Sequence, residues 1–295
     1  MGDIQAQPAL QTNSSDRIVF RAGQDNSGTL KVLEKKLKRE ASQYVDKAYS
    51  RHAPQKRSLL TAVRQFVSAE NLITAIFPDR PLCAEDIPIL QPKIKEADVP
   101  LDQMRQFGVL TSYDKVKDAD DVYLYSGLYV LSAPEEEARS AVNHQENYKY
   151  LRPHVNESKL CHLPSGEQAY YTELGAIGFN VGIILFSDEL EHGSHFHLQP
   201  TCTDAEGHVF NTDSIVEHMD GFKIYTPITV EKNGVQEERT LAFGTNITIW
   251  GGLPGAAMSL VSDSRKRKSY SMAGASEILV VLKQKAFSAK ASAKK

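Results

Sequence analysis

Residues 225–243 read YTPITVEKNGVQEERTLAF, and this stretch predicts the fold class. Two β-prone arms flank the pair Asn233-Gly234. That pair is typical of a type I′ turn, because both positions of such a turn need a positive φ. The stretch therefore predicts an antiparallel β-hairpin with a tight connection.

Other segments with β propensity lie on both sides of this hairpin. Residues 121–131, DVYLYSGLYVL, predict a buried strand, and Ser132, Pro134 and three glutamates after it predict a helix start. Further strands are expected near residues 169–173, 178–186, 222–231, 235–243, 246–250, 257–261 and 278–284. The C-terminal part is therefore predicted to be a mainly antiparallel β-sandwich or open barrel.

The N-terminal part has the apolar periodicity of helices. Apolar residues recur at spacings of three and four from Leu30 to Ala48, and again from about Ser58 to Phe77. Because Pro54 separates the two stripes by a short connection, we expect an antiparallel helical hairpin. The fold class predicted is α+β, with this hairpin packed on the β part.

Five prolines between Pro78 and Pro100 predict an extended crossover between the two parts. The predicted parts of the chain are a flexible leader (1–26), a helical hairpin (27–77), a proline-rich crossover (78–112), a mainly β domain of the α+β type (113–287) and a disordered basic tail (288–295).

Composition excludes several classes of protein. A chain of 295 residues with 41% hydrophobic residues is not predicted to be disordered. Because the sequence has no long apolar run, no membrane partner is predicted either. No secretory signal is recognisable at the N-terminus. Three cysteines, Cys83, Cys161 and Cys202, match no disulfide framework and indicate a reducing compartment. A cytoplasmic location is predicted, with the nucleus as the alternative.

Charge is distributed unevenly along the chain. Residues 264–295 hold nine basic residues and one acidic residue, a net charge of +8, whereas the rest of the chain has −11. A basic C-terminal arm is typical of contact with the phosphate backbone of nucleic acid. The alternative is a solvated loop. The residues predicted to bind nucleic acid are Arg265, Lys266, Arg267, Lys268, Lys283 and Lys285.

A second candidate site is a histidine cluster, since five of the nine histidines fall between His192 and His218. If His195 and His197 lie on a strand, their period of two places both imidazoles on one face. The third ligand of a metal site would be His208, which suits zinc, or a carboxylate from the returning segment, which suits non-haem iron. The alternative is a polar strand edge with no metal or other cofactor.

No nucleotide-binding or hydrolase motif is present in the sequence. The sequence therefore favours a non-enzymatic binding or assembly protein, such as a viral or phage structural or accessory protein, that self-associates and contacts nucleic acid. The alternative hypothesis is a metal-dependent enzyme that uses the histidine cluster of the β domain.

Overall fold

The structure, a computed structural model, describes residues 18–48, 53–96, 98–115, 122–143, 149, 152, 154–176, 179–251 and 263–292. Its central feature is one sheet of 11 strands in the order β2-β3-β11-β10-β7-β6-β5-β4-β8-β9, with β1 paired to β10. The strands are β1 (Ile18–Arg21), β2 (Leu110–Lys115), β3 (Val122–Leu131), β4 (Val155–His162), β5 (Gln168–Ala176), β6 (Phe179–Leu190), β7 (Gly193–Gln199), β8 (Thr201–Thr203), β9 (Val209–Asn211), β10 (Val216–Lys232) and β11 (Val235–Trp250).

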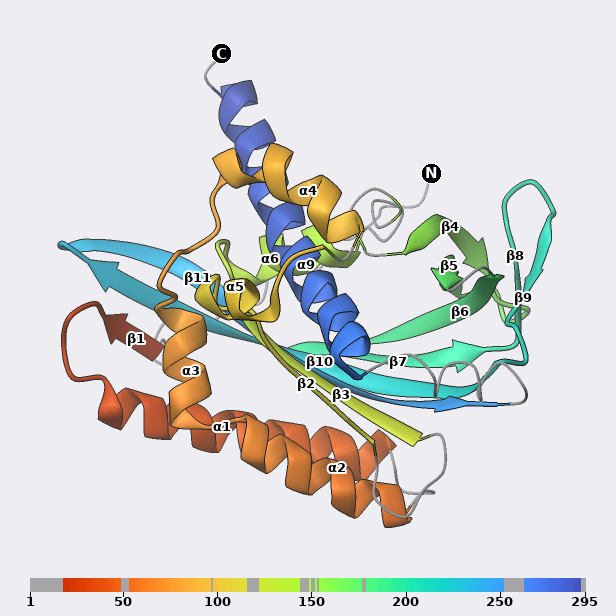
Figure 1. The fold of residues 1–295 in the computed structure, drawn as a ribbon, viewed down its shortest axis with the longest axis horizontal. Coiled ribbons are helices and arrows are strands. Elements are labelled where there is room, and N and C mark those ends of the chain that lie inside the picture. The colour runs from red at the N-terminus through yellow and green to blue at the C-terminus, as the bar shows by residue number, and fades with distance from the viewer. Residues whose placement is uncertain are drawn as a thin grey trace, which may run out of the picture.

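Helices cover both faces of this sheet, as Figure 1 shows. The α-helices are α1 (Ser27–Ala48), α2 (Ala53–Phe66), α3 (Ala69–Ile76), α4 (Ile87–Lys95), α5 (Leu101–Gln106), α6 (Glu135–Asn143) and α9 (Asp263–Ser292), with a 3-10 turn at Ala84–Asp86. Among the described residues, no helix has both the length and the apolar character needed to span a bilayer.

Helices α1, α2 and α3 pack on one face of the sheet. Their apolar stripes, including Leu33, Leu37 and Leu59, join Phe222 and Phe243 of β10 and β11 in one buried cluster. Helices α4, α5, α6 and α9 form a second buried cluster with Tyr129 of β3 and with Tyr225 and Ala242. The amphipathic helices predicted at the N-terminus thus find their partner within the chain, because alternate residues of the central strands supply an apolar surface to each layer.

The hairpin predicted at residues 225–243 is confirmed. Strands β10 and β11 pair in antiparallel register up to Lys232 and Val235. Between them, Asn233 has φ of 54° and Gly234 has φ of 76°. Two successive positive φ values are what a type I′ turn requires, so the short-range sequence signal is sufficient here.

The α+β fold class is confirmed: N-terminal helices pack on a large, mainly antiparallel sheet that is not closed, with β2 and β9 at opposite ends. Two finer predictions are wrong. Residues 278–284, predicted as a strand, are helical and belong to α9. Residues 18–21, predicted as part of a flexible leader, form β1 parallel to β10. The strand expected at 257–261 lies outside the described residues.

The prediction of unpaired cysteines is also wrong. Cys161 and Cys202 form a disulfide with a Cα–Cα distance of 5.7 Å, whereas Cys83 is free and exposed. The two paired cysteines are fully buried at the β4–β8 end of the sheet. Without three unpaired cysteines, the argument for a reducing compartment no longer holds.

Candidate functional site

A cavity of about 380 Å³ lies between the sheet and helix α9. Residues of eight strands, β2 to β7, β10 and β11, line it from the sheet, and residues of α6 and one face of α9 also line it. The apolar part of its wall consists of side chains from the sheet: Leu174, Ile183, Leu185, Phe196, Met219 and Trp250. A pocket of this volume and apolar character has the dimensions of small-molecule sites in proteins.

Stacked tyrosines form another part of the wall. The Tyr125 and Tyr270 rings lie 4.1 Å apart, and the Tyr113 and Tyr270 rings 5.3 Å apart. Tyr123 continues the stack behind Tyr113 at 5.4 Å. Because Tyr270 comes from α9 and the other rings come from β2 and β3, this stack fastens the helix to the sheet.

A buried ionic cluster lies at the same cavity. Lys223 of β10 donates hydrogen bonds to both oxygens of Glu277 of α9, at 2.6 and 2.8 Å. Arg152 donates to Glu277 Oε1 at 2.7 Å, and the Tyr129 hydroxyl donates to Oε2 at 2.5 Å. The Glu277 side chain is only 3% exposed, so its carboxylate depends on these four bonds in place of water.

The environment changes the acidity of Glu277, Lys223 and Tyr129. Burial opposes ionisation of Glu277, but Lys223 and Arg152 outweigh it, and the pKa of the carboxyl lies below its usual value. Burial lowers the pKa of the Lys223 ammonium, and the attraction of Glu277 offsets only part of that shift. Burial also raises the pKa of the Tyr129 hydroxyl, which therefore stays protonated and donates.

Two polar atoms of cavity residues on β11 have no hydrogen-bond partner within the described chain. They are the buried acceptor Asn246 Oδ1 and the buried donor Trp250 Nε1. Both residues belong to β11, four positions apart, and period two places them on the same face of that strand. Buried polar atoms are nearly always satisfied in proteins, so such a pair indicates places for the polar groups of a ligand or for water.

The basic residues predicted to bind nucleic acid do not form a free arm. Arg265 to Lys268 form the first turns of α9, and Lys266 is buried with its ammonium 4.5 Å from the centre of the Tyr123 ring. Arg265 and Lys266 line the cavity. Lys285 donates to the Ser132 carbonyl at 2.7 Å, and Lys283 is exposed farther along the same helix.

The three histidines predicted as a metal site are not brought together. His195 and His197 lie on β7 with ring centres 5.4 Å apart, as the period of two predicts. His208 belongs to a separate group with Asp204 and Glu206. The acidic residue grouped with His195 and His197 is instead Asp188, from the neighbouring strand β6, and Asp220 of β10 lies 2.8 Å from His195 Nε2.

The sequence reasoning did not identify Lys223, Glu277 or Arg152 as site residues. One signal was present: Glu277 is the single acid in the basic segment and directly precedes the apolar run Ile278–Leu282. A charged residue next to a fully buried run is usually paired. Its partners Lys223 and Arg152 are 54 and 125 positions away in the sequence, so no local pattern identifies them.

No protein-family model matches the chain, and no curated protein sequence matches it. Solved structures with some similarity include the Zhui aromatase/cyclase from Streptomyces sp. R1128, with 12% identity, a TM-score of 0.38, and coverage of 55% of this chain and 93% of that one. The protein TTHA0849 from Thermus thermophilus has 14% identity and a TM-score of 0.38, over 53% and 95% of the two chains. A START superfamily protein from Mycobacterium smegmatis has 13% identity and a TM-score of 0.33, over 50% and 94%.

The prediction of a viral or phage assembly protein that contacts nucleic acid is wrong. The segment interpreted as a basic arm is a helix packed between the sheet and other helices. The alternative function, an enzyme using His195, His197 and His208 together, is not supported either, because His208 lies in another group.

Proposed function

We propose that the chain binds a small, largely apolar molecule in the cavity between the sheet and α9. The observation that carries this proposal is the cavity itself, about 380 Å³ in volume, with apolar walls and a few inward polar groups. Ligand sites typically combine an apolar enclosure with a small number of fixed polar contacts. Strands of the sheet line one side of this space, and helices α6 and α9 line the other.

The chemistry of the walls favours a ligand that contains a flat ring. Tyr125 and Tyr270 stack on each other and offer ring surfaces, and Phe196 and Trp250 add further aromatic area. Aromatic side chains pack against other rings in offset or edge-to-face geometry, with a gain beyond that of area alone. A planar apolar ligand is therefore favoured over a flexible aliphatic chain.

The polar groups favour a ligand with a donor and an acceptor. Asn246 Oδ1 can accept a hydrogen bond and Trp250 Nε1 can donate one, and neither has a partner among the described residues. Lys223 and Arg152 carry positive charge on the same cavity wall. A hydroxyl or carboxylate on the ligand would therefore meet complementary groups there.

Titration with 1-anilinonaphthalene-8-sulfonate, a planar apolar dye with one anionic group, tests this proposal. Trp250 is the only tryptophan of the chain and lines the cavity, so binding there must quench its fluorescence. We expect one saturable site with parallel changes in dye and Trp250 emission. Saturation without any change in Trp250 emission would contradict the proposal.

Variants that fill the cavity give the decisive comparison. Ala273→Phe from α9 and Ser194→Leu from β7 enter the cavity from opposite walls. Each should weaken dye binding by about tenfold or more, equivalent to about 1.4 kcal/mol. Gln284→Phe, at an exposed position of the same helix, is the matched control and should bind as the wild type does. If both cavity variants fold, by circular dichroism, and bind dye unchanged, the cavity is not the site.

A further inference from the structure

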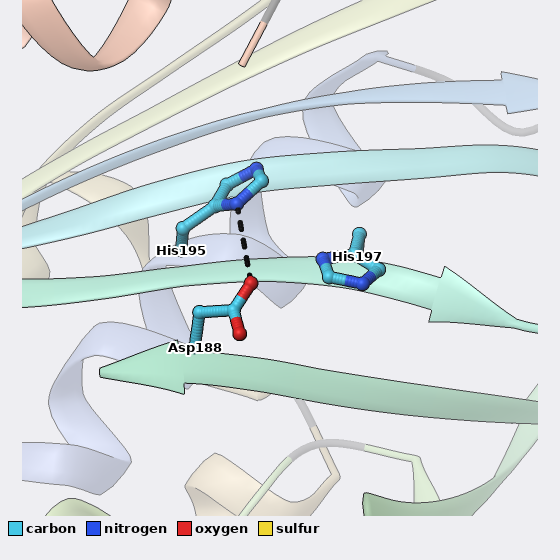
Figure 2. A group of neighbouring side chains, drawn as sticks. All are labelled: Asp188, His195 and His197. Carbon is cyan, nitrogen blue, oxygen red and sulfur yellow. Dashed lines mark ion pairs between the residues drawn. The ribbon is translucent and has the colours of Figure 1, made fainter. Parts of the chain in front are cut away.

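The strands that line the cavity carry a different set of side chains on their other face. Strands β6 and β7 turn Ser187, Ser194 and Phe196 towards the cavity. The alternating residues Asp188, His195 and His197 therefore lie on the opposite face, and Asp188 is directly paired with His195 in the register. Figure 2 shows the Asp188 carboxylate directed at the His195 ring, with the His197 ring beside it.

The hydrogen bonding of His195 determines which of its nitrogens is available. Asp220 of β10 lies 2.8 Å from His195 Nε2, and a carboxylate can only accept, so Nε2 carries the proton. The lone pair of the neutral ring is then on Nδ1. That nitrogen lies 3.9 Å from Asp188 Oδ2, too far for a hydrogen bond. His195 Nδ1 and Asp188 Oδ2 each have a lone pair, and the two atoms lie near each other without a hydrogen bond between them.

His197 supplies a third atom that could bind a metal ion. Its Nδ1 is buried and has no hydrogen-bond partner in the described part of the chain. The ring is fixed by an edge contact with Phe186, with ring centres 5.2 Å apart. One ligand atom from each of Asp188, His195 and His197 lies within 4.8 Å of the others.

We propose that Asp188, His195 and His197 bind a divalent transition-metal ion of the zinc type. Two imidazoles and one carboxylate are a ligand set that such ions prefer, and it leaves a coordination position for water. Ligand atoms around a tetrahedral zinc lie about 3.3 Å apart, given bonds of about 2.0–2.1 Å. The ligand atoms lie within 4.8 Å of one another, so all three side chains must move closer together to bind the ion, and the 50% exposed side chain of Asp188 has room to do so.

Asp220 acts as a positioning residue in this site. A carboxylate that accepts from the second nitrogen of a metal-bound histidine fixes the tautomer and raises the basicity of the ligand. Asp220 is only 12% exposed, and its strand neighbours β7 in the sheet, so its contact with His195 is held by the sheet register. The arrangement is independent of the cavity, because it occupies the other face of the same strands.

The test measures Zn²⁺ bound to the full chain after removal of any affinity tag, by calorimetry and by metal analysis of the purified protein. We expect one Zn²⁺ per chain and visible absorption bands when Co²⁺ replaces it. Asp188→Asn and His197→Gln should abolish this binding. Asp220→Asn should weaken it by about 10–100-fold, the range found for groups that orient metal ligands.

His208→Gln is the matched control, because His208 lies in the separate group with Asp204 and Glu206. It should leave the high-affinity site unchanged. Thermal unfolding of each variant without metal shows whether the fold is retained. Absence of stoichiometric Zn²⁺ in the wild type, or loss of binding in His208→Gln but not in His197→Gln, would overturn the proposal.

Discussion

The substitution Glu277→Gln tests whether the buried ionic cluster holds α9 on the sheet. Glutamine keeps the size of the side chain but removes the negative charge that Lys223, Arg152 and Tyr129 share. Two cations then face each other at the cavity without a counter-charge. We expect a lower free energy of unfolding at pH 7.

The magnitude follows from burial and from the exposure of the partners. Removal of one partner of a buried ion pair typically costs about 3–5 kcal/mol. Glu277 is 3% exposed, whereas Lys223 and Arg152 are 16% and 29% exposed and regain some contact with water. We therefore expect the lower end of the range, about 3 kcal/mol.

The pH dependence has a defined sign. The pKa of Glu277 in the folded state lies below its usual value. The contribution of Glu277 to the free energy of unfolding is therefore complete above the pKa of an unfolded glutamate, about 4.3, and is lost as the pH falls through the lowered pKa. The difference between wild type and Glu277→Gln should therefore shrink on acidification below about pH 4. The lowered pKa of Lys223 acts at the alkaline end, where stability rises with pH until the unfolded lysine also loses its proton.

Urea unfolding followed by circular dichroism at several pH values measures these effects. Glu237→Gln is the matched control, since Glu237 is an exposed acid that pairs with Arg239 at 2.6 Å and with Lys285 at 3.7 Å, and it should change stability by less than about 1 kcal/mol. Adding Lys223→Met to Glu277→Gln should recover stability, because the unpaired buried ammonium is removed. A change below about 1 kcal/mol in Glu277→Gln at pH 7 would refute the reasoning.

Two further changes test the sheet. Replacing Cys161 and Cys202 by serine removes a cross-link between positions 41 residues apart and should lower the free energy of unfolding by about 4 kcal/mol, because the unfolded chain gains entropy. The wild type in reductant should be as stable as the double variant. Equal stability of the oxidised and reduced wild type would contradict this prediction. Gly221→Ala should cost about 1–3 kcal/mol in urea unfolding, since the new Cβ would lie 2.4 Å from Phe196 Cζ and 2.6 Å from the Thr245 carbonyl. The control is Gly28→Ala, where the added Cβ meets nothing within 4 Å, and the two alanine variants should differ clearly.

Local chemistry made part of the fold predictable. The Asn233-Gly234 turn and the strand at residues 122–131 follow from short-range preferences, because turn geometry and β propensity are set within a few residues. The prediction of a strand at residues 278–284 is wrong for a physical reason. Helix α9 is apolar on several sides, because the sheet and helices α4–α6 all pack against it. A helix buried all round has no amphipathic period to distinguish it from a buried strand.

The candidate sites depend on pairings that are distant in the sequence. His195 and His197 could be placed on one face from their spacing alone, but Asp188 joins them only through the β6–β7 register. The cavity is even harder to predict from the sequence. Its wall combines residues of eight strands with one face of α9, and the order of those strands cannot be read from their propensities.

The position of α9 in the sequence has a consequence for synthesis of the chain. Translation completes all 11 strands before residues 263–292 are made, and β1 must wait for β10, some 210 residues downstream, before it can pair. Until α9 docks, the nascent sheet exposes its apolar cavity wall, a state prone to aggregation. The helix that covers the cavity wall is thus made after every strand of the described sheet.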